Sequence, residues 1–508
     1  DTDTYTGHDH YGISPSPGQA ERHGQRPPTP LGGYGGIYPG PGIETRAGRP
    51  VRVKWINEAL PGVHILRQCI DPTIFHGRDF PEVRTVAHLH GGHTPPDADG
   101  LPEAWSTPGA SATGAGYNPD DFIYPNQQQA CMLWYHDHAM GITRLNIYAG
   151  LAGLYIIRDE TEDALDLPRG DYEVPLLIQD RIVNPDGTLH YPTRGNSPAH
   201  PIWNAHFFGN TPVVNGKAYP FLEVEPRRYR LRLLNGSQSR FYNLWFQPAA
   251  RTSATSSASV SGWTAADATP FHVIGSDGGL LPKPAEMSKV MISPAERVDL
   301  IIDFSGMAAG AVLTLMNDAP APVPFGGAPA IDEILQFRVS RPLLDSDETT
   351  PAAKLQLPPL PSLTATPGLP ARQIVLFEQA VPATMENWVP DLGGSPRMGV
   401  TEFLINAKYY NDPVEEQPKA GTTEVWEIFN GTTDTHPIHL HLVQFQVLNR
   451  QTLRSEPFFN AWYAWTQGQG PRPSLSEYLI GEPMPPEPDE SGWKDIVRTM
   501  PLEIARII

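Results

Sequence analysis

The chain has 508 residues, more than one hydrophobic core usually supports, so its length predicts several domains. Its 56 Pro and 46 Gly are typical of short strands joined by many turns, and we expect mostly β structure. The formal net charge of −19 argues against nucleic acid and anionic membranes as partners. No apolar run reaches the roughly 20 residues that cross a bilayer, so we expect a soluble protein.

The N-terminal part divides by composition into an arm and two strand-rich units. Residues 1–35 are polar and rich in Gly and Pro, and are predicted to form an arm over the surface. A first β-sandwich is expected over residues 36–160, where IETRAGRPVRVKWI alternates with a period of two. A second is expected over residues 171–341. Within it, the Ser/Thr/Ala-rich stretch 249–269 is predicted to be a mobile loop without chemistry.

The C-terminal part consists of a connector and a third unit. Residues 342–371 are rich in Pro, which predicts a semi-extended linker that spans one domain to reach the next. Residues 372–508 form the third strand-rich unit. The two cysteines, Cys69 and Cys131, are interpreted as buried structural thiols or as a mutual disulfide, and their spacing does not decide between these alternatives.

Three His-X-His pairs are the strongest chemical signal in the sequence. Each is expected on a strand, where residues i and i+2 point to one face and direct two imidazoles at the same place. One isolated pair is as readily an accident of composition or a surface feature, but three pairs are harder to dismiss. Carboxylates of the kind that hard cations prefer do not cluster with them, so the pattern favours copper or zinc. The pairs are His88 and His90, His136 and His138, and His439 and His441.

His436 is expected to belong to a different site. It lies three positions before His439, so it has the opposite parity on an extended strand and faces away from that pair. Pro437 removes a ladder hydrogen bond at this point, which indicates an edge strand. We infer a second metal site near His436; the alternative is an ordinary turn histidine.

Five segments together resemble one known family, the three-domain multicopper oxidases, in its branch of bacterial spore-coat laccases and phenoxazinone synthases. This resemblance covers nearly the whole chain, and it implies an all-β fold of three cupredoxin-like Greek-key β-sandwich domains. The segments are HLHGGHTPPDADG (88–100), LWYHDHAMGITRLNIYAGLAGLYIIRD (133–159), IGSDGGLLPKP (274–284), SPAERVDLIIDF (293–304) and THPIHLHLVQFQVLNR (435–450).

The resemblance also implies a role for each candidate residue and four copper ions in the complete protein. Asp99, which follows the first pair, resembles the family's proton source for oxygen reduction, although a turn aspartate in PDADG is the alternative. The copper ligands implied are His88 and His439 for type 2 copper, His90 and His136 for one type 3 copper, His138 and His441 for the other, and His436 for type 1 copper.

The resemblance stops at the end of the chain. The family completes both copper sites with a His-Cys-His motif, a further His and an axial Met, and nothing in this sequence matches them. The segment GWKDIVRTMPLEIARII (492–508) resembles the strands just before that motif. We therefore expect the third sandwich to lack its C-terminal strands and the natural chain to continue beyond Ile508. Completion by a neighbouring copy through strand exchange is the alternative.

The expected function is a copper oxidase that couples one-electron oxidation of small aromatic reductants, such as o-aminophenols and phenols, to reduction of O2 to water. The alternatives are a bilirubin or metal-ion oxidase on the same scaffold, a non-catalytic cupredoxin-scaffold binding protein, and a zinc protein. The expected partners are the reductant and O2, with no nucleic acid and no membrane, and homo-oligomerisation stays open. The location stays open, because a leader could have been removed from a chain that begins at Asp1. Since no signal peptide opens the chain given, a cytoplasmic or spore-associated location is slightly favoured over secretion.

Overall fold

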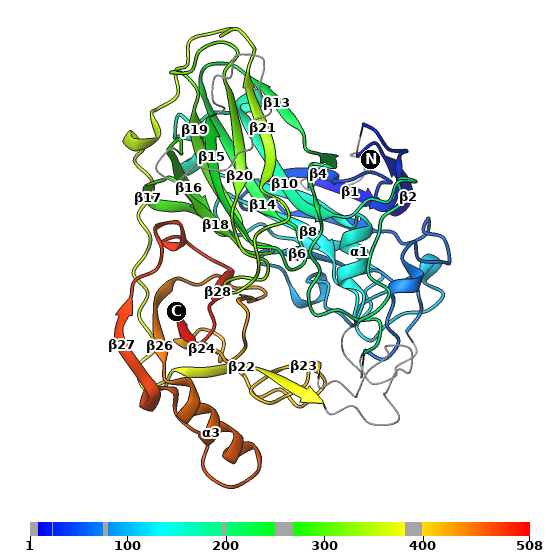
Figure 1. Cartoon of the computed structure of the whole chain (residues 1–508), viewed down its shortest axis with the longest axis vertical. Helices are drawn as coiled ribbons and strands as arrows, with labels where there is room; N and C mark the ends of the chain where they lie inside the picture. The colour runs from blue at the N-terminus through cyan, green and yellow to red at the C-terminus, as the bar shows by residue number, and fades with distance from the viewer. Residues whose placement is uncertain (1–8, 23, 75–79, 196–199, 249–267, 382–398) are drawn as a thin grey trace.

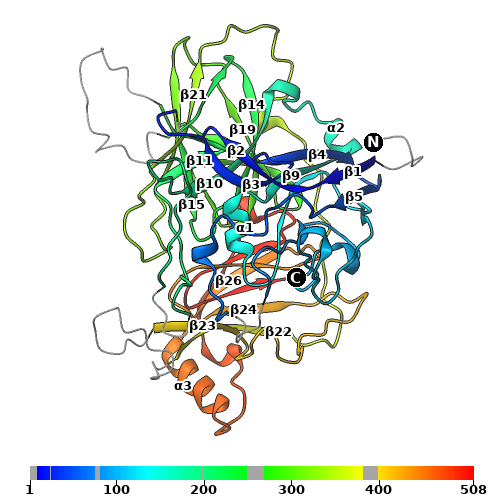
Figure 2. The same ribbon diagram turned by 90° about the vertical axis from the view of Figure 1, so that its right-hand side faces the viewer.

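The structure is a computed structural model that describes residues 9–22, 24–74, 80–195, 200–248, 268–381 and 399–508. It contains three strand-rich domains that meet at one junction (Figure 1). Domain 2, coloured green, lies above domain 3, coloured yellow to red. Domain 1, coloured blue to cyan, lies beside the place where they meet, as the view turned by 90° also shows (Figure 2). The prediction of a mostly β chain is confirmed.

Domain 1 is built from two sheets that pack against each other. Its elements are β1 (Asp9–Ile13), β2 (Pro15–Ala20), β3 (Thr29–Tyr34), β4 (Gly40–Arg46), β5 (Val51–Trp55), β6 (Ala87–His90), β7 (Phe122–Tyr124), β8 (Cys131–Asp137), α1 (Thr143–Ala149), β9 (Ala152–Arg158) and α2 (Glu160–Asp163). One sheet has the order β4-β9-β8-β6 and the other the order β1-β5-β7. Side chains such as Val51, Leu133 and Tyr155 fill the core between them, because alternate residues of each strand point inward.

The first 35 residues differ from the predicted surface arm. Strand β1 pairs in parallel with β5, and β2 and β3 form an antiparallel pair. Ile13, Leu31 and Tyr34 are buried in hydrophobic clusters of domain 1. The interpretation of a surface arm is therefore wrong for residues 9–22 and 24–35. Backbone hydrogen bonds hold this segment, β1 to β5 and β2 to β3. Such bonds do not require an alternating apolar pattern, so the sequence shows little sign of these strands.

Domain 2 has the largest hydrophobic core. Its strands are β10 (Glu173–Arg181), β11 (Thr211–Val214), β12 (Lys217–Ala218), β13 (Phe221–Val224), β14 (Arg228–Asn235), β15 (Tyr242–Pro248), β16 (Phe271–Ser276), β17 (Gly279–Met287), β18 (Val290–Ile292), β19 (Arg297–Asp303), β20 (Val312–Asn317) and β21 (Glu333–Val339). A seven-stranded sheet, β12-β11-β10-β14-β19-β16-β17, packs on a five-stranded sheet, β13-β21-β20-β15-β18. The predicted loop 249–269 lies outside the described residues as far as residue 267, and Thr269 forms a bridge to Phe246.

The Pro-rich connector contributes to the core of domain 2. Ala352, Leu355 and Leu357 belong to the domain 2 cluster. A short 3-10 turn over Ala352–Lys354 directs these side chains inward. The connector therefore packs along domain 2 on its way to domain 3.

Domain 3 is built around a six-stranded sheet. Its elements are β22 (Arg372–Val381), β23 (Gly399–Ile405), β24 (Trp426–Asn430), β25 (His436–His439), β26 (Val447–Leu453), α3 (Ser455–Thr466), β27 (Leu479–Met484), β28 (Ile496–Thr499) and β29 (Glu503–Ile507). The sheet order is β23-β22-β24-β29-β26-β27, so β29 lies in the interior of the sheet. Strands β25 and β28 pair only with each other among the described residues. Strand β25 carries His436 and His439, and His441 follows just past its end.

Both cysteines are free and buried. The alternative of a mutual disulfide is therefore wrong, and the two thiols are structural. Burial raises the pKa of the Cys69 thiol to about 11 and that of the Cys131 thiol to about 12. Neither thiol supplies a thiolate at neutral pH.

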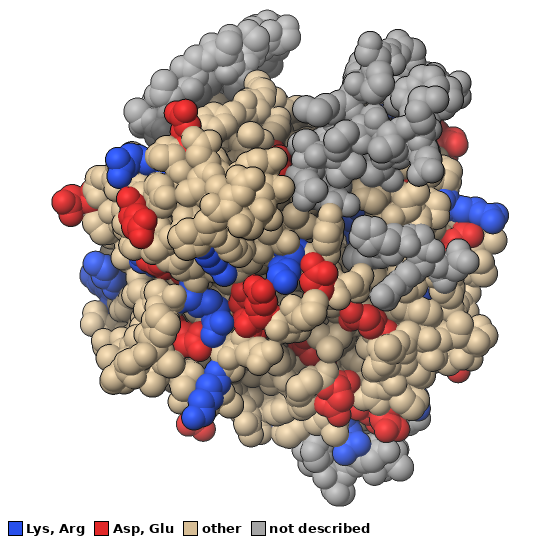
Figure 3. Space-filling view, turned by 90° about the horizontal axis from the view of Figure 1, so that it is seen from below, with Lys and Arg blue, Asp and Glu red and all other residues tan. Residues whose placement is uncertain are grey.

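The surface carries both signs of charge. On the face seen from below in Figure 3, acidic and basic side chains are interspersed and neither sign forms a continuous patch. Among the described residues, no helix combines the length and apolar composition needed to cross a bilayer.

Candidate metal centre

Paired strands bring the two histidine pairs of domain 1 together. Strands β6 and β8 are antiparallel neighbours, and His88 lies directly opposite His136 in their register. Because β6 is extended, His90 shares a face with His88. The two other pairs differ from the prediction in one respect, since His138 and His441 lie just past the ends of β8 and β25. The backbone N–H of His138 donates to Val86 O at 2.8 Å, which keeps that residue beside β6.

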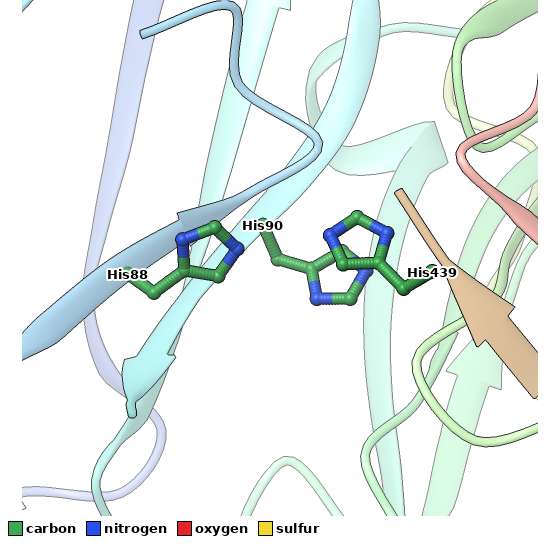
Figure 4. Close-up of side chains that lie close together, drawn as sticks. All are labelled: His88, His90 and His439. Atoms are coloured by element: carbon green, nitrogen blue, oxygen red, sulfur yellow. The ribbon is translucent and has the colours of Figure 1, made fainter. Parts of the chain in front are cut away.

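Strand β25 inserts the histidines of domain 3 opposite those of domain 1. The ring of His439 stacks on His90 with a centroid distance of 3.7 Å, and the ring of His441 stacks on His88 at 4.1 Å. Figure 4 shows His439 approaching His88 and His90 from the opposite side. His138 completes the group, 5.1 Å from His88 and 5.2 Å from His441 between ring centroids. The structure therefore brings all six paired histidines together at the boundary of domains 1 and 3.

Backbone carbonyls fix the orientation of three of these imidazoles. Nδ1 of His88 lies 2.6 Å from Asp99 O, Nδ1 of His136 lies 2.8 Å from Asp137 O, and Nδ1 of His439 lies 2.9 Å from Asp495 O. A carbonyl oxygen only accepts, so each Nδ1 carries the proton and each Nε2 keeps its lone pair. For His88 and His439 that Nε2 is buried without a hydrogen-bond partner among the described residues. Unpaired buried nitrogens of this kind are typical of metal ligands.

The Asp99 side chain lies beside this histidine cluster. Its Oδ2 is 2.8 Å from His441 Nδ1, and its Oδ1 accepts from Thr94 Oγ1 at 3.0 Å. The residue is 2% exposed, so the carboxylate is shielded from solvent. Asp99 thus touches His88 through its backbone and His441 through its side chain.

Burial keeps the four clustered imidazoles of domain 1 neutral. The pKa of His136 and that of His138 are lowered to about 3, chiefly by burial and in part by neighbouring imidazoles. The pKa values of His88 and His90 are held well below the ordinary value, first by burial and then by the surrounding histidines. Neutral imidazole is the form that binds a metal ion, so the cluster is ready for a cation at neutral pH.

The donor set fits copper. Single ring nitrogens of His88, His90 and His439 lie within 4.8 Å of one another, and the same holds for donor atoms of His88, Asp99 and His441. Sites rich in imidazole suit copper and zinc. A cluster of six imidazoles offers more nitrogen donors than one tetrahedral zinc ion takes up, which favours several copper ions.

His436 lies at the other end of β25 and lines a cavity of about 420 Å³. Its Nε2 is 2.8 Å from Thr432 Oγ1, and Phe403 packs edge-on against its ring with a centroid distance of 5.8 Å. Burial lowers the pKa of His436. No ring contact joins His436 to the six-histidine cluster among the described residues, in line with the predicted opposite parity.

Two functional features of this region were missed in the sequence. The carboxylate of Asp495 lies 3.6 Å from His90 and 3.5 Å from His439, although the sequence separates it from both. An ion pair of 2.9 Å between His206 and Asp434 lies in the wall of the cavity beside His436. A charged residue next to the apolar run of β28 was the one signal for Asp495, and no local pattern marks the His206 pair.

The sequence of this chain matches described families and known proteins. Residues 81–162 and 384–503 each match a family described as multicopper oxidase. The chain is 42% identical over 495 residues to a laccase of Bacillus subtilis (strain 168), covering 96% of this chain and 85% of the relative. It is 35% identical over 516 residues to a laccase of Haloferax volcanii, covering 99% of this chain and 76% of the relative.

A solved structure confirms the fold. The McoA multicopper oxidase of the hyperthermophile Aquifex aeolicus superposes with a TM-score of 0.68 at 26% sequence identity, covering 100% of this chain and 91% of that chain. The expected cupredoxin-like architecture is therefore confirmed, as is the cofactor type, copper. With the histidine cluster at the boundary of domains 1 and 3, these matches show that the chain belongs to the multicopper oxidase family.

Proposed function

We propose that this protein oxidises small aromatic reductants, phenols and o-aminophenols, one electron at a time and transfers the electrons to O2, forming water. The observation that carries the proposal is the convergence of six imidazoles from two domains, with a seventh histidine, His436, lining a cavity at the other end of β25. The name laccase, carried by the relatives in Bacillus subtilis and Haloferax volcanii, supports the choice of a phenolic donor.

The ligand assignments form part of this proposal. Copper held by these residues supplies one-electron transfer from the donor to O2. The free Nε2 atoms of His88 and His439 support their assignment as ligands of one copper ion, the type 2 ion. The type 3 ions are assigned to the four remaining histidines, His90 with His136 and His138 with His441, and His436 is assigned to type 1 copper.

The cavity beside His436 suits an aromatic donor. Its wall contains aromatic side chains including Trp203, Phe241 and Phe403, and Trp203 packs edge-on against Phe403 at 5.9 Å. Such a wall stacks on a flat ring of the donor. The paired side chains of His206 and Asp434 add hydrogen-bonding groups to this apolar wall, where they orient a hydroxyl or amino group.

Burial separates the oxygen-reducing centre from this cavity. His88, His90 and His136 are at most 5% exposed, so the chain excludes an aromatic donor from their faces. Asp99 holds Nδ1 of His441 through its carboxylate, which orients that ring. The role of Asp99 as a proton source for oxygen reduction stays a prediction.

Oxygen uptake by the copper-loaded full-length protein tests this function. Steady-state rates are compared for 2-aminophenol, a methoxyphenol, bilirubin and cuprous ion, with absorption recorded near 600 nm. We expect the two small aromatic donors to react fastest. A clear preference for cuprous ion or bilirubin assigns the protein to one of the alternative oxidases. Absence of oxygen uptake in protein that holds copper supports the non-catalytic alternative.

A further inference from the structure

A buried group of ionised side chains lies where domain 2 meets domain 3. This junction cluster consists of Asp277, Glu296, Arg297, Lys494 and Asp495, all of them at most 2% exposed. Lys494 Nζ donates to Glu296 Oε1 at 2.7 Å and lies 2.9 Å from Asp277 Oδ2. Arg297 donates to both carboxylate oxygens of Asp495, with Nη1 at 2.9 Å from Oδ1. The charged side chains of domain 2 therefore form buried ion pairs with those of domain 3.

Asp495 is the member of this cluster that reaches the histidines. Its Oδ1 is 3.6 Å from Nε2 of His90 in domain 1 and 3.5 Å from Nδ1 of His439 in domain 3. Its backbone oxygen is 2.9 Å from the same Nδ1 of His439. Arg297, at the start of β19, ties the carboxylate to domain 2. One residue thus connects all three domains at the metal centre.

The contacts of Asp495 determine which ring nitrogens face the cluster. A proton on Nδ1 of His439 is held by the Asp495 backbone oxygen, so its Nε2 points inward. For His90, Nε2 lies 3.6 Å from the carboxylate, beyond hydrogen-bond length, and Nδ1 lies 3.3 Å from His136 Nε2. The carboxylate therefore places a negative charge beside the His90 ring, whereas the backbone oxygen holds the proton of His439.

We propose that Asp495, fixed by Arg297, is a positioning residue of the metal centre: its backbone oxygen sets the tautomer and orientation of His439, and its carboxylate holds a negative charge beside His90 and His439. The inference rests on the proposed function in so far as these two imidazoles bind copper. It adds a residue of domain 2, through Arg297, to the support of a centre whose ligands come from domains 1 and 3.

If Asp495 had a purely structural role, its loss would affect copper binding no more than the loss of another buried aspartate. Asp489 serves as that control. Asp489 is also a buried aspartate paired with an arginine, with Arg498 Nη2 donating to its Oδ2 at 3.0 Å. Arg498 lies 3.6 Å from Glu296 and thereby adjoins the junction cluster. Asp489 contacts no histidine in the described part of the chain. Both aspartates lose a buried charge on conversion to Asn, but only one such change alters an imidazole partner.

The test compares Asp495→Asn with Asp489→Asn in the full chain. Both variants are first shown to be folded by far-UV circular dichroism and gel filtration. They are then loaded with copper and equilibrated with a competing chelator, and the copper retained per chain is measured by mass spectrometry. We expect Asp495→Asn to weaken copper retention about 10- to 100-fold, the usual effect of losing a ligand's hydrogen-bond partner. Asp489→Asn is expected to retain copper as the parent chain does, even where it melts at a lower temperature.

A variant of Arg297 and NMR of the histidines test the positioning role independently. Arg297→Lys keeps the positive charge but loses the forked contact, and should weaken copper retention less than Asp495→Asn. NMR of histidine labelled with ¹⁵N in the metal-free parent chain should show His439 protonated on Nδ1. The opposite tautomer for His439, or equal copper retention in the two Asn variants, overturns the positioning role. A parent chain that retains no copper contradicts the proposed function instead.

Discussion

The two ends of strand β25 place histidines in unlike surroundings. His439 stacks on His90 within the six-histidine cluster, whereas His436 lines an aromatic cavity. Three residues of extended strand separate them by only about 10 Å. Opposite parity on a four-residue strand therefore suffices to place one histidine in the cluster and the other in the cavity wall.

The largest effect is expected at the buried end. His439→Ala removes a cluster imidazole and leaves the stacked His90 without its partner ring. Oxygen uptake should fall by at least about 1000-fold with every donor, since loss of a group acting directly in catalysis costs this much or more. An oxygen electrode and copper analysis measure the change. His272→Ala removes a histidine on β16, paired with Glu286 outside the cluster, and should leave both values unchanged.

A different result is expected at the other end of the strand. His436→Ala should lower donor oxidation about 100-fold or more, because the proposed entry point for electrons is lost. Copper in the six-histidine cluster should be retained, since His436 has no ring contact with it among the described residues. Electron paramagnetic resonance together with copper analysis distinguishes the two ends. If His436→Ala also removes copper from the six-histidine cluster, His436 and His439 do not belong to separate sites.

The cavity wall should affect affinity without affecting chemistry. Trp203→Ala removes one aromatic wall, whose stacking on a donor ring is worth about 0.5–1.5 kcal/mol. KM for phenols should rise about 2- to 12-fold, with kcat nearly unchanged. Hexacyanoferrate(II), which has no ring, should show no such change in KM. Phe325→Ala, at a side chain that is 78% exposed and not part of the cavity wall, is the matched control.

The smallest effect on copper content and oxygen uptake is expected from a change at Glu173, which lies in an ion-pair network away from both ends of β25. Burial opposes ionisation of Glu173, but Arg232, Arg230 and Arg158 lower its pKa to about 2. Its contribution to stability is therefore present above pH 4.5 and is lost as the pH falls towards 2. Glu173→Gln should cost roughly 3 kcal/mol at pH 7 and less than half of that at pH 3.

Thermal unfolding of the Glu173→Gln variant at the two pH values measures this difference. Copper content and oxygen uptake at neutral pH should equal those of the parent chain. A loss of stability that is the same at pH 3 and pH 7 contradicts the linkage, and a loss of copper shows that the buried end of β25 depends on distant packing.

The sequence predicts features that depend on the two-residue repeat of a strand. It does not predict contacts that form only when separate domains pack together. The parity of His436 against His439 follows from strand geometry alone, and the structure agrees with it. Asp495 meets His90 only because domains 1, 2 and 3 pack together, and no periodic pattern records that contact. Strand β1 escaped prediction for a related reason, since its pairing partner β5 lies about 40 residues further along the chain. His138 and His441 are near their predicted places, but contacts beyond the strand ends hold them there: the backbone N–H of His138 donates to Val86 O, and the ring of His441 bonds to the Asp99 carboxylate.

The interior position of β29 determines when, during synthesis, the histidine cluster can be completed. Strand β29 lies between β24 and β26, so the sheet that supports β25 closes only after Ile507 has been synthesised. Translation from His441 to Ile507 takes about 3 to 13 s at 5–20 residues per second. During that interval the four histidines of domain 1 already exist while their partners from domain 3 lack a finished sheet. Copper supplied during that interval therefore meets an incomplete set of histidines, and loading of the six-histidine cluster has to follow the synthesis of β29.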